Sequence, residues 1–230
     1  IFYNNESFSA EIEVAHFGDE VLPHVVPGWK ITNQENETIF SGTFEQSDIP
    51  IGNCLSIGNI EIDLHDINVP SQLTLTVNVQ GFENDWDFWI YPSKKETIDE
   101  IMVTSSLSGA ALKKLANGGS VLWSIPQNTK SENLNDGIGF SSIFWNTAWT
   151  DGQKPHTLGI LCNPKHPALA QFPTEYHSNW QWWDAMSHCD AINLNSFPVE
   201  LKPVVRIIDD WVTNRRLALL VEAKVGKGKI

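Results

Sequence analysis

Cysteine is scarce in this sequence, and the few thiols lie far apart. The 230 residues include three cysteines, Cys54, Cys162 and Cys189, and no CxxC pair. Disulfide frameworks need more cysteines at regular spacings, and structural zinc sites need closely paired ligands. The histidines of the C-terminal half are too widely separated for a compact metal-binding pattern such as HExxH. The sequence therefore predicts neither a disulfide scaffold nor a metal site.

Positive charge is also in short supply. The chain has 15 lysines and arginines against 28 aspartates and glutamates, a formal net charge of -13 and a sequence pI near 4.8. The electrostatic field of a chain with this negative charge repels phosphate backbones and anionic lipid surfaces. Nucleic acid is therefore not an expected partner, whereas neutral ligands such as sugars are not disfavoured.

Long hydrophobic runs are missing as well. No stretch reaches the roughly 18 apolar residues that a membrane helix needs, and the sequence does not open on a charged-then-apolar stretch. The sequence predicts no membrane span and no signal peptide. Because it begins without methionine and ends on "VGKGKI", we expect it to be a fragment of a longer protein.

Motifs for cofactors and nucleophiles are missing from the sequence. There is no GxGxxG, GxxxxGK[ST] or GxSxG, so no cofactor and no catalytic residue is predicted. Cys162 is followed by Asn163 and Pro164 rather than by a glycine elbow, although a nucleophile with His166 stays an alternative. Asp209 and Asp210 end a predicted strand and, being adjacent, point to opposite faces.

The first part of the chain shows the two-residue periodicity of β-strands. Residues 1–92 alternate apolar and polar side chains, as in "LTLTVNVQG", where Leu73, Leu75, Val77 and Val79 share one face. Glycine and proline interrupt the pattern at short intervals. These features predict an immunoglobulin-like β-sandwich over residues 1–92.

The pattern changes after Pro92. The segments "IDEIMVTSS", "SGAALKKLANGG" and "SVLWSI" predict strand, helix and strand, with Gly118 and Gly119 ending the helix. This order predicts a parallel crossover. We therefore expect an α+β multidomain protein in which residues 93–230 form an open α/β domain of the flavodoxin or amidotransferase type, truncated at its C-terminus.

Tryptophan is abundant, with ten residues in the chain, and it clusters in "FPTEYHSNWQWW" at 172–183. Large aromatic rings either fill a core or present flat faces to ligands such as sugars. Helical spacing places Trp180 and Trp183 on one side and turns Trp182 away, so one core cannot bury all three indoles. Structural and ligand-facing roles both stay open. The candidate ligand-binding residues are Trp145, Trp149, Glu175, His177, Trp180, Trp182 and Trp183.

Several stretches together resemble a known family. "FSSIFWNTAWTDGQKPHTLGILCNPKHPALAQFPTEYHSNWQWWDAM", "VVRIIDDW" and "LALLVEAKVGKGKI" are similar to the C-terminal region of bacterial glycoside hydrolase family 2, β-galactosidase-like proteins. "AEIEVAHFG", "SIGNIEIDL" and "NDWDFWIYP" resemble the β-sandwich that follows the catalytic barrel in those proteins.

The resemblance implies a non-catalytic accessory role. No segment here is similar to the barrel that carries the catalytic glutamates, which needs roughly 250 residues. The implied partners are the upstream barrel of the same polypeptide and an oligosaccharide, and the implied location is the periplasm or the outside of a bacterial cell. The alternatives are a free-standing carbohydrate-binding protein and an independent hydrolase or amidotransferase-like enzyme built on the expected α/β domain.

Overall fold

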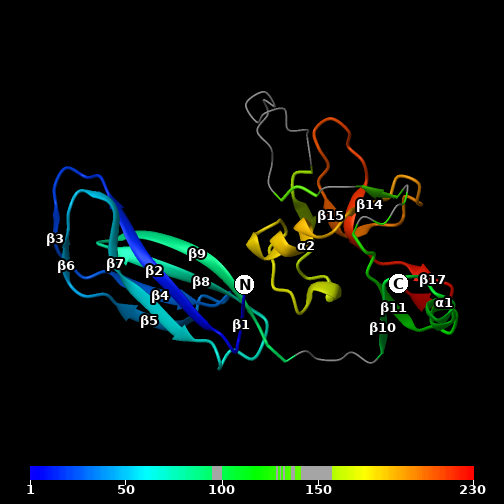
Figure 1. Cartoon of the computed structure of the whole chain (residues 1–230), viewed down its shortest axis with the longest axis horizontal. Coiled ribbons are helices and arrows are strands. Elements are labelled where there is room, and N and C mark those ends of the chain that lie inside the picture. Colours follow the sequence, from blue (N-terminus) through cyan, green and yellow to red (C-terminus); the bar gives the residue numbers. More distant parts are fainter. Residues whose placement is uncertain (95–99, 128, 130, 132, 136–137, 141–156) are drawn as a thin grey trace. The chain divides into compact units, whose positions relative to one another are not determined.

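The computed structural model describes the chain apart from residues 95–99, 128, 130, 132, 136–137 and 141–156. It divides into two compact units, each described separately below (Figure 1). Unit 1 comprises Ile1–Lys95 with Gln171–Pro173, and unit 2 comprises Glu96–Ala170 with Thr174–Ile230.

Unit 1 is built from strands. A five-stranded sheet has the order β1-β9-β8-β4-β5, and two-stranded pairs join β2 to β7 and β3 to β6. All pairs in this unit are antiparallel except β1 with β9. The strands are β1 (Phe2–Tyr3), β2 (Ser7–His16), β3 (Leu22–Val25), β4 (Gly28–Thr32), β5 (Thr38–Thr43), β6 (Ser47–Ile49), β7 (Gly52–Asp63), β8 (Ser71–Val79) and β9 (Phe82–Tyr91).

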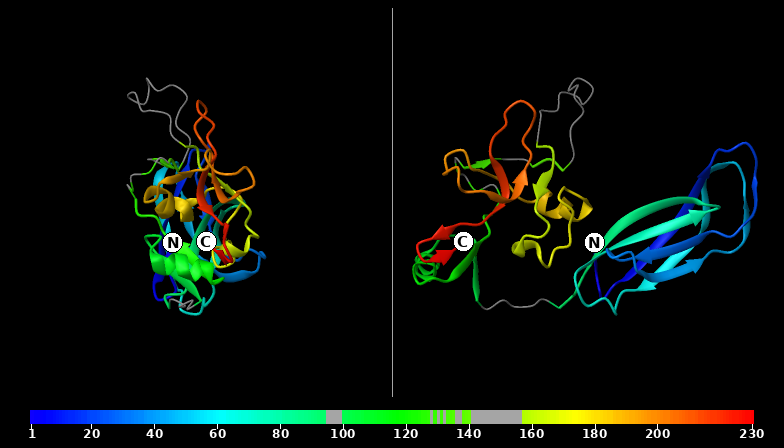
Figure 2. Two further views of the ribbon diagram at one scale, coloured as in Figure 1. Left: turned by 90° about the vertical axis from the view of Figure 1, so that its right-hand side faces the viewer. Right: turned by 180° about the vertical axis from the view of Figure 1, so that it is seen from behind.

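The core of unit 1 lies between two layers of strands. Phe8 and Ile60, from the β2–β7 pair, belong to the same buried cluster as Ile31, Leu75 and Ile90 from the five-stranded sheet. Figures 1 and 2 show the long β2–β7 ribbon lying along that sheet, as in a β-sandwich. Burial of these large side chains from both layers is the main favourable term for this unit.

The alternation expected for residues 73–79 is confirmed in β8. Leu73, Leu75 and Val77 are all buried, while Thr74 and Thr76 between them are partly exposed. The period of two arises because successive side chains of a strand point to opposite faces. The neighbouring strand β9 does not keep this alternation, because Trp86 is exposed and Phe88, Trp89 and Ile90 are all buried.

Unit 2 contains two further sheets and little helix. One sheet has the order β10-β11-β18-β17, and the other has the order β12-β14-β16-β15-β13. Its elements are β10 (Ile101–Thr104), α1 (Gly109–Ala116), β11 (Ser120–Trp123), β12 (Leu134–Asn135), β13 (Ile160–Cys162), η1 (Pro167–Leu169), η2 (Trp180–Trp182), α2 (Trp183–Ser187), β14 (Ala191–Asn193), β15 (Pro203–Ile207), β16 (Leu217–Val221), β17 (Lys224–Val225) and β18 (Gly228–Lys229).

The predicted strand–helix–strand crossover is present at the start of unit 2. Strands β10 and β11 pair in parallel, with Ile101 opposite Ser120, and α1 connects them. Ser108 caps the helix by accepting a hydrogen bond from the backbone N–H of Ala111, and the helix ends before Gly118, as the sequence predicts. Ala111 and Leu115 bury the inner face of α1 against Val121.

The predicted fold class is nevertheless wrong. The described residues are mostly β, with 45% of them in strands and 9% in helices, and they show no flavodoxin-like α/β domain. The strands of the second sheet of this unit, β12 to β16, all pair antiparallel, and no further strand–helix–strand crossover joins parallel strands there in the described residues. Apolar runs of three to five residues fit either kind of sheet, so their hydrophobicity did not distinguish the two.

One glycine in unit 1 offers a test of the backbone conformation of β7. Gly58 has a φ of 140°, and a Cβ there would lie 2.7 Å from Cδ1 of the buried Phe44. Gly58→Ala is expected to lower the free energy of unfolding by about 1–3 kcal/mol. Gly52→Ala, on the same strand, meets only ordinary contact with Leu55 and should change stability by less than about 1 kcal/mol. Urea denaturation followed by circular dichroism measures both; equal effects would contradict the assigned backbone strain.

Candidate functional site

The tryptophan-rich segment of unit 2 folds as two short helices in series. The side-chain oxygen of Asn179 accepts a hydrogen bond of 2.7 Å from the backbone N–H of Trp180, which begins η2. Helix α2 follows directly and ends at Ser187. Asparagine is favoured at this position because its side chain satisfies a free backbone donor of the first turn.

The three indoles of this segment divide as the helical spacing predicts. Trp182 is buried, and its Nε1–H donates a hydrogen bond of 2.8 Å to Oγ1 of the buried Thr174. Trp180 and Trp183 remain 66% and 52% exposed. Trp182 is therefore a structural residue in this fold, and the other two indoles are presented on the surface.

Phe140 joins the two exposed indoles. Its ring stacks on Trp180 with centroids 5.2 Å apart and meets Trp183 edge-on at 5.4 Å. The Trp180 and Trp183 centroids lie 6.2 Å apart. Such offset and edge-to-face pairs each contribute about 0.5–1.5 kcal/mol beyond their burial. We refer to Phe140, Trp180 and Trp183 as the aromatic cluster.

The position of Phe140 depends on tertiary contacts that no local sequence pattern predicts. The backbone N–H of Gly139 donates a 2.6 Å hydrogen bond to Oγ1 of the buried Thr157. Gly159, at a φ of 112°, lets Ser178 approach closely, because a Cβ there would lie 2.7 Å from the Ser178 hydroxyl. Phe140 was missed because it lies forty positions before Trp180 in a segment without periodicity.

The other predicted site residues lie elsewhere or outside the described residues. Glu175 is half-buried, and its carboxylate oxygens lie 3.5 Å from the Asn179 amide nitrogen. His177 is exposed; its Nδ1 lies 3.1 Å from the carbonyl oxygen of Ser178, and its ring packs edge-on against Tyr176. No ring contact between His177 and the aromatic cluster occurs in the described part of the chain. Trp145 and Trp149 fall within 141–156 and so outside the described residues.

The adjacent carboxylates at the end of β15 are held in a structural arrangement. Arg215 binds Asp209 through Nε at 2.9 Å and Nη2 at 2.6 Å, and Asp210 accepts from the backbone N–H groups of Val212 and Thr213. The hydrogen bond from the Arg215 side chain holds the pKa of Asp209 below its usual range. The Thr213 hydroxyl does the same for the pKa of Asp210. Both groups are thus ionised, and neither is suited to act as the protonated acid of a glycosidase.

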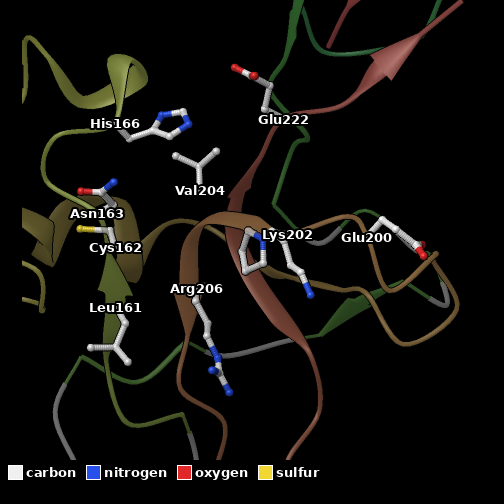
Figure 3. A pocket seen from close by; sticks show the side chains of 10 residues that line it. Leu161, Cys162, Asn163, His166, Glu200, Lys202, Val204, Arg206 and Glu222 are labelled. Carbon is white, nitrogen blue, oxygen red and sulfur yellow. The ribbon is translucent and has the colours of Figure 1, made fainter.

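Cys162 and His166 lie at an open cavity of about 570 Å³ but do not form a nucleophile–base pair (Figure 3). The thiol donates to the carbonyl of Glu175 at 3.3 Å, and Nδ1 of His166 accepts from the backbone N–H of Ala168 at 3.2 Å. Burial and, secondarily, the Glu175 charge raise the pKa of the Cys162 thiol. Cys162 is therefore protonated at neutral pH, the opposite of an activated thiolate.

The described residues contain neither a metal-binding cluster nor a membrane-spanning helix. They contain no group of three or more histidine, cysteine, aspartate or glutamate side chains arranged to hold a metal ion. Among the same residues, no helix has the length and apolar character needed to cross a membrane.

Fold and site together define a mostly β, two-unit protein that presents an exposed aromatic cluster on its second unit. Residues 102–230 match the family model described as "Domain of unknown function (DUF8487)", and the chain belongs to this family. Residues 6–92 match a second model, "Domain of unknown function (DUF8488)". Comparison with curated proteins gives no match. These descriptions name no activity, so the resemblance to glycoside hydrolase family 2 stays a prediction.

The different roles of the indoles predict different stabilities for two matched variants. Trp182→Phe removes the hydrogen bond to Thr174 and part of a buried ring, and should lower the free energy of unfolding by about 1–3 kcal/mol. Trp180→Phe alters a side chain that is two-thirds exposed and should change it by less than about 0.5 kcal/mol. Urea denaturation measures both variants. Equal losses would show that Trp180 is as structural as Trp182.

The Asp209–Arg215 pair predicts a pH-dependent stability difference. Arg215→Gln should cost about 3 kcal/mol near pH 7, because it leaves the buried Asp209 carboxylate unpaired. The lowered native pKa of Asp209 makes this contribution complete above the unfolded value of about 3.9. It disappears as the pH falls through the native pKa.

Denaturation series at neutral and acidic pH measure the stability difference between the parent and Arg215→Gln, which should shrink in acid. Arg206→Gln is the control, because Arg206 is exposed and makes no ion pair in the described structure; its change should stay within about 0.5 kcal/mol. A difference for Arg215→Gln that is constant with pH would contradict the assignment.

Proposed function

We propose that this chain is a carbohydrate-binding accessory part of a glycan-degrading protein and that the aromatic cluster is its sugar-binding surface. The observation that carries the proposal is the exposure of Trp180 and Trp183 beside Phe140 in one mutually stacked group. Contiguous groups of exposed apolar side chains are typical of binding surfaces, whereas single exposed rings such as Trp211 are ordinary.

Sugar rings match such a surface chemically. The C–H faces of a pyranose are apolar and flat, so they stack on indoles, while the hydroxyl groups at the ring edge need polar partners. Asp184 follows Trp183 directly, and its side chain is 83% exposed. Its carboxylate oxygens accept hydrogen bonds from hydroxyl groups, and one of them lies 3.2 Å from His188.

The charge of the chain favours a neutral ligand over the other common ligands of aromatic surfaces. Single-stranded nucleic acids also stack on exposed rings, but their binding sites combine those rings with a positively charged groove. Here the net charge is -13, and Asp184, which follows Trp183 in the sequence, is acidic. A neutral glycan meets no such electrostatic penalty.

The resemblance to glycoside hydrolase family 2 supplies the wider context of the proposal. In that context the chain is the accessory C-terminal portion of a β-galactosidase-like enzyme in the periplasm or outside the cell. It supports the catalytic barrel or holds glycan near it. A free-standing carbohydrate-binding protein would use the same aromatic cluster.

Titration with oligosaccharides tests the proposal. β-Galactosides such as lactose and plant-type oligosaccharides such as xylotriose are titrated into the chain by calorimetry. We expect saturable binding of at least one of them, with a Kd in about the millimolar range or tighter. Trp180→Ala and Trp183→Ala should each weaken it by about tenfold or more, because each removes one stacking face.

Trp211→Ala is the matched control. Trp211 lies on the same unit and is 49% exposed, but it makes no ring contact with the cluster in the described structure. Its loss should leave sugar affinity unchanged. If no sugar of the panel binds, or if Trp211→Ala weakens binding as much as Trp180→Ala, the aromatic cluster is not a carbohydrate site.

A further inference from the structure

Arg206 differs from the other two arginines of the chain. Arg215 binds the carboxylates of Asp209 and Asp210, and Arg216 donates to three backbone carbonyls. The side chain of Arg206 makes no hydrogen bond or ion pair within the described chain, although acidic residues outnumber basic ones by 28 to 15. Its guanidinium is therefore available to a ligand.

The sheet directs Arg206 outward. It lies on β15 between Val205 and Ile207, which are both 1% exposed and face the core. Because side chains alternate along a strand, Arg206 points to the opposite face. The antiparallel register places it directly opposite Leu161 on β13, and Leu161 is 39% exposed. The two residues form part of one outer face.

This outer face lines the open cavity of about 570 Å³ at which Cys162 also lies. Lys202 lines it as well, and Figure 3 shows the nitrogen ends of Lys202 and Arg206 extending to the same side. The Lys202 ammonium makes no ion pair in the described structure. Leu161, Pro203 and Val204 supply apolar wall. We refer to this cavity as the Arg206 recess.

The remaining polar groups of the recess add hydrogen-bond donors. The side-chain oxygen of Asn163 accepts from the backbone N–H of Lys165, which leaves its amide N–H groups free to donate. Nδ1 of His166 accepts from Ala168, so in the neutral ring the proton is on Nε2. Two cations, the Asn163 amide and the His166 ring thus line one opening.

Acidic residues also line the recess, but they reduce its attraction for an anion only in part. Glu222 is paired with Lys229 at 2.9 Å, and Figure 3 shows Glu200 extending away from Arg206. The Cys162 thiol is protonated and carries no charge. The Glu175 charge acts on the Cys162 side of the recess, where it raises the pKa of the thiol.

We propose that the Arg206 recess binds the carboxylate of a small acidic ligand, with the Arg206 guanidinium as its main partner and Lys202 as a second cation. The guanidinium offers two parallel N–H donors that match the two oxygens of a carboxylate. The apolar wall then contacts the carbon body of the ligand. This site is separate from the aromatic cluster and does not depend on the proposed sugar-binding role.

A carboxylate fits this recess better than a phosphate or sulfate. Glu200 and Glu222 contribute negative charge at the edge of the opening, which penalises a dianion more than a monoanion. Phosphate sites also commonly use the backbone N–H groups of a helix N-terminus. None of the recess residues comes from the first turn of α1 or α2.

Arginine side-chain NMR tests the proposal directly, because the chain has only three arginine Nε–H groups. Galacturonate is titrated into the labelled chain at physiological salt, with galactose as the neutral counterpart and inorganic phosphate and sulfate as tetrahedral anions. We expect a saturable shift of the Arg206 signal with galacturonate, at a Kd in about the millimolar range. The Arg215 and Arg216 signals should not move, and galactose should leave Arg206 unchanged.

Variants assign the binding to the recess. Arg206→Gln should weaken galacturonate binding by about tenfold or more, and Arg206→Lys, which keeps the charge but loses the paired donors, should weaken it less. Lys202→Gln should have an intermediate effect. Lys113→Gln removes an exposed cation of α1 outside the recess and should have none.

Four results would overturn the proposal. They are no saturable shift of Arg206 with galacturonate, an equal shift with galactose, binding of phosphate or sulfate without galacturonate, and an equal loss in Lys113→Gln. If Arg206→Gln does not fold, Arg206→Lys and Lys202→Gln decide the matter with the same titration.

Discussion

The buried indole of Trp182 is the contact on which the presentation of the aromatic cluster depends. Its Nε1–H donates to Thr174 and its ring is 5% exposed, so the start of the tryptophan-rich segment is tied to its end. With Trp182 turned inward, helical geometry turns Trp180 and Trp183 outward. One buried hydrogen bond thus sets the direction of two exposed rings.

The rest of unit 2 relies on similar side-chain to backbone links. Its strands are short, so much of its chain lies in connecting segments that cannot satisfy their polar groups within a sheet. Thr157 accepts from Gly139, and Arg216 donates to the carbonyls of Phe197, Pro198 and Leu201. The link between Thr157 and Gly139 lies next to Phe140 in the chain, whereas Trp180 and Trp183 are positioned by η2 and α2.

The sequence predicted local features better than their assembly. The alternation in 73–79, the crossover around α1 and the division of the indoles each follow from the period of a strand or helix, and each is confirmed. The α/β domain was inferred by extending one crossover to the whole of 93–230. The sequence of a short apolar segment such as β13 does not indicate whether it pairs parallel or antiparallel. Its pairing depends on strands that are distant in sequence.

The same limit applies to the candidate sites. The exposed indoles could be identified because they lie close together in sequence, whereas Phe140 lies beside them through tertiary contacts such as that of Gly139 with Thr157. The sequence did not identify Arg206 as a candidate binding residue. Arg206 differs from Arg215 and Arg216 because its side chain has no partner in the described structure, whereas theirs are paired. Partners of this kind are tertiary, and no local pattern encodes them.

The central claim is that the aromatic cluster binds glycan while Trp182 stays inside the fold. The most direct measurement is an NMR titration that follows the indole N–H signals of the ten tryptophans as a binding oligosaccharide is added. The account predicts that the Trp180 and Trp183 signals shift together and saturate, and that the Trp182 and Trp211 signals stay in place. Shifts at Trp211 without Trp180 and Trp183, or no shift at any indole, would contradict it.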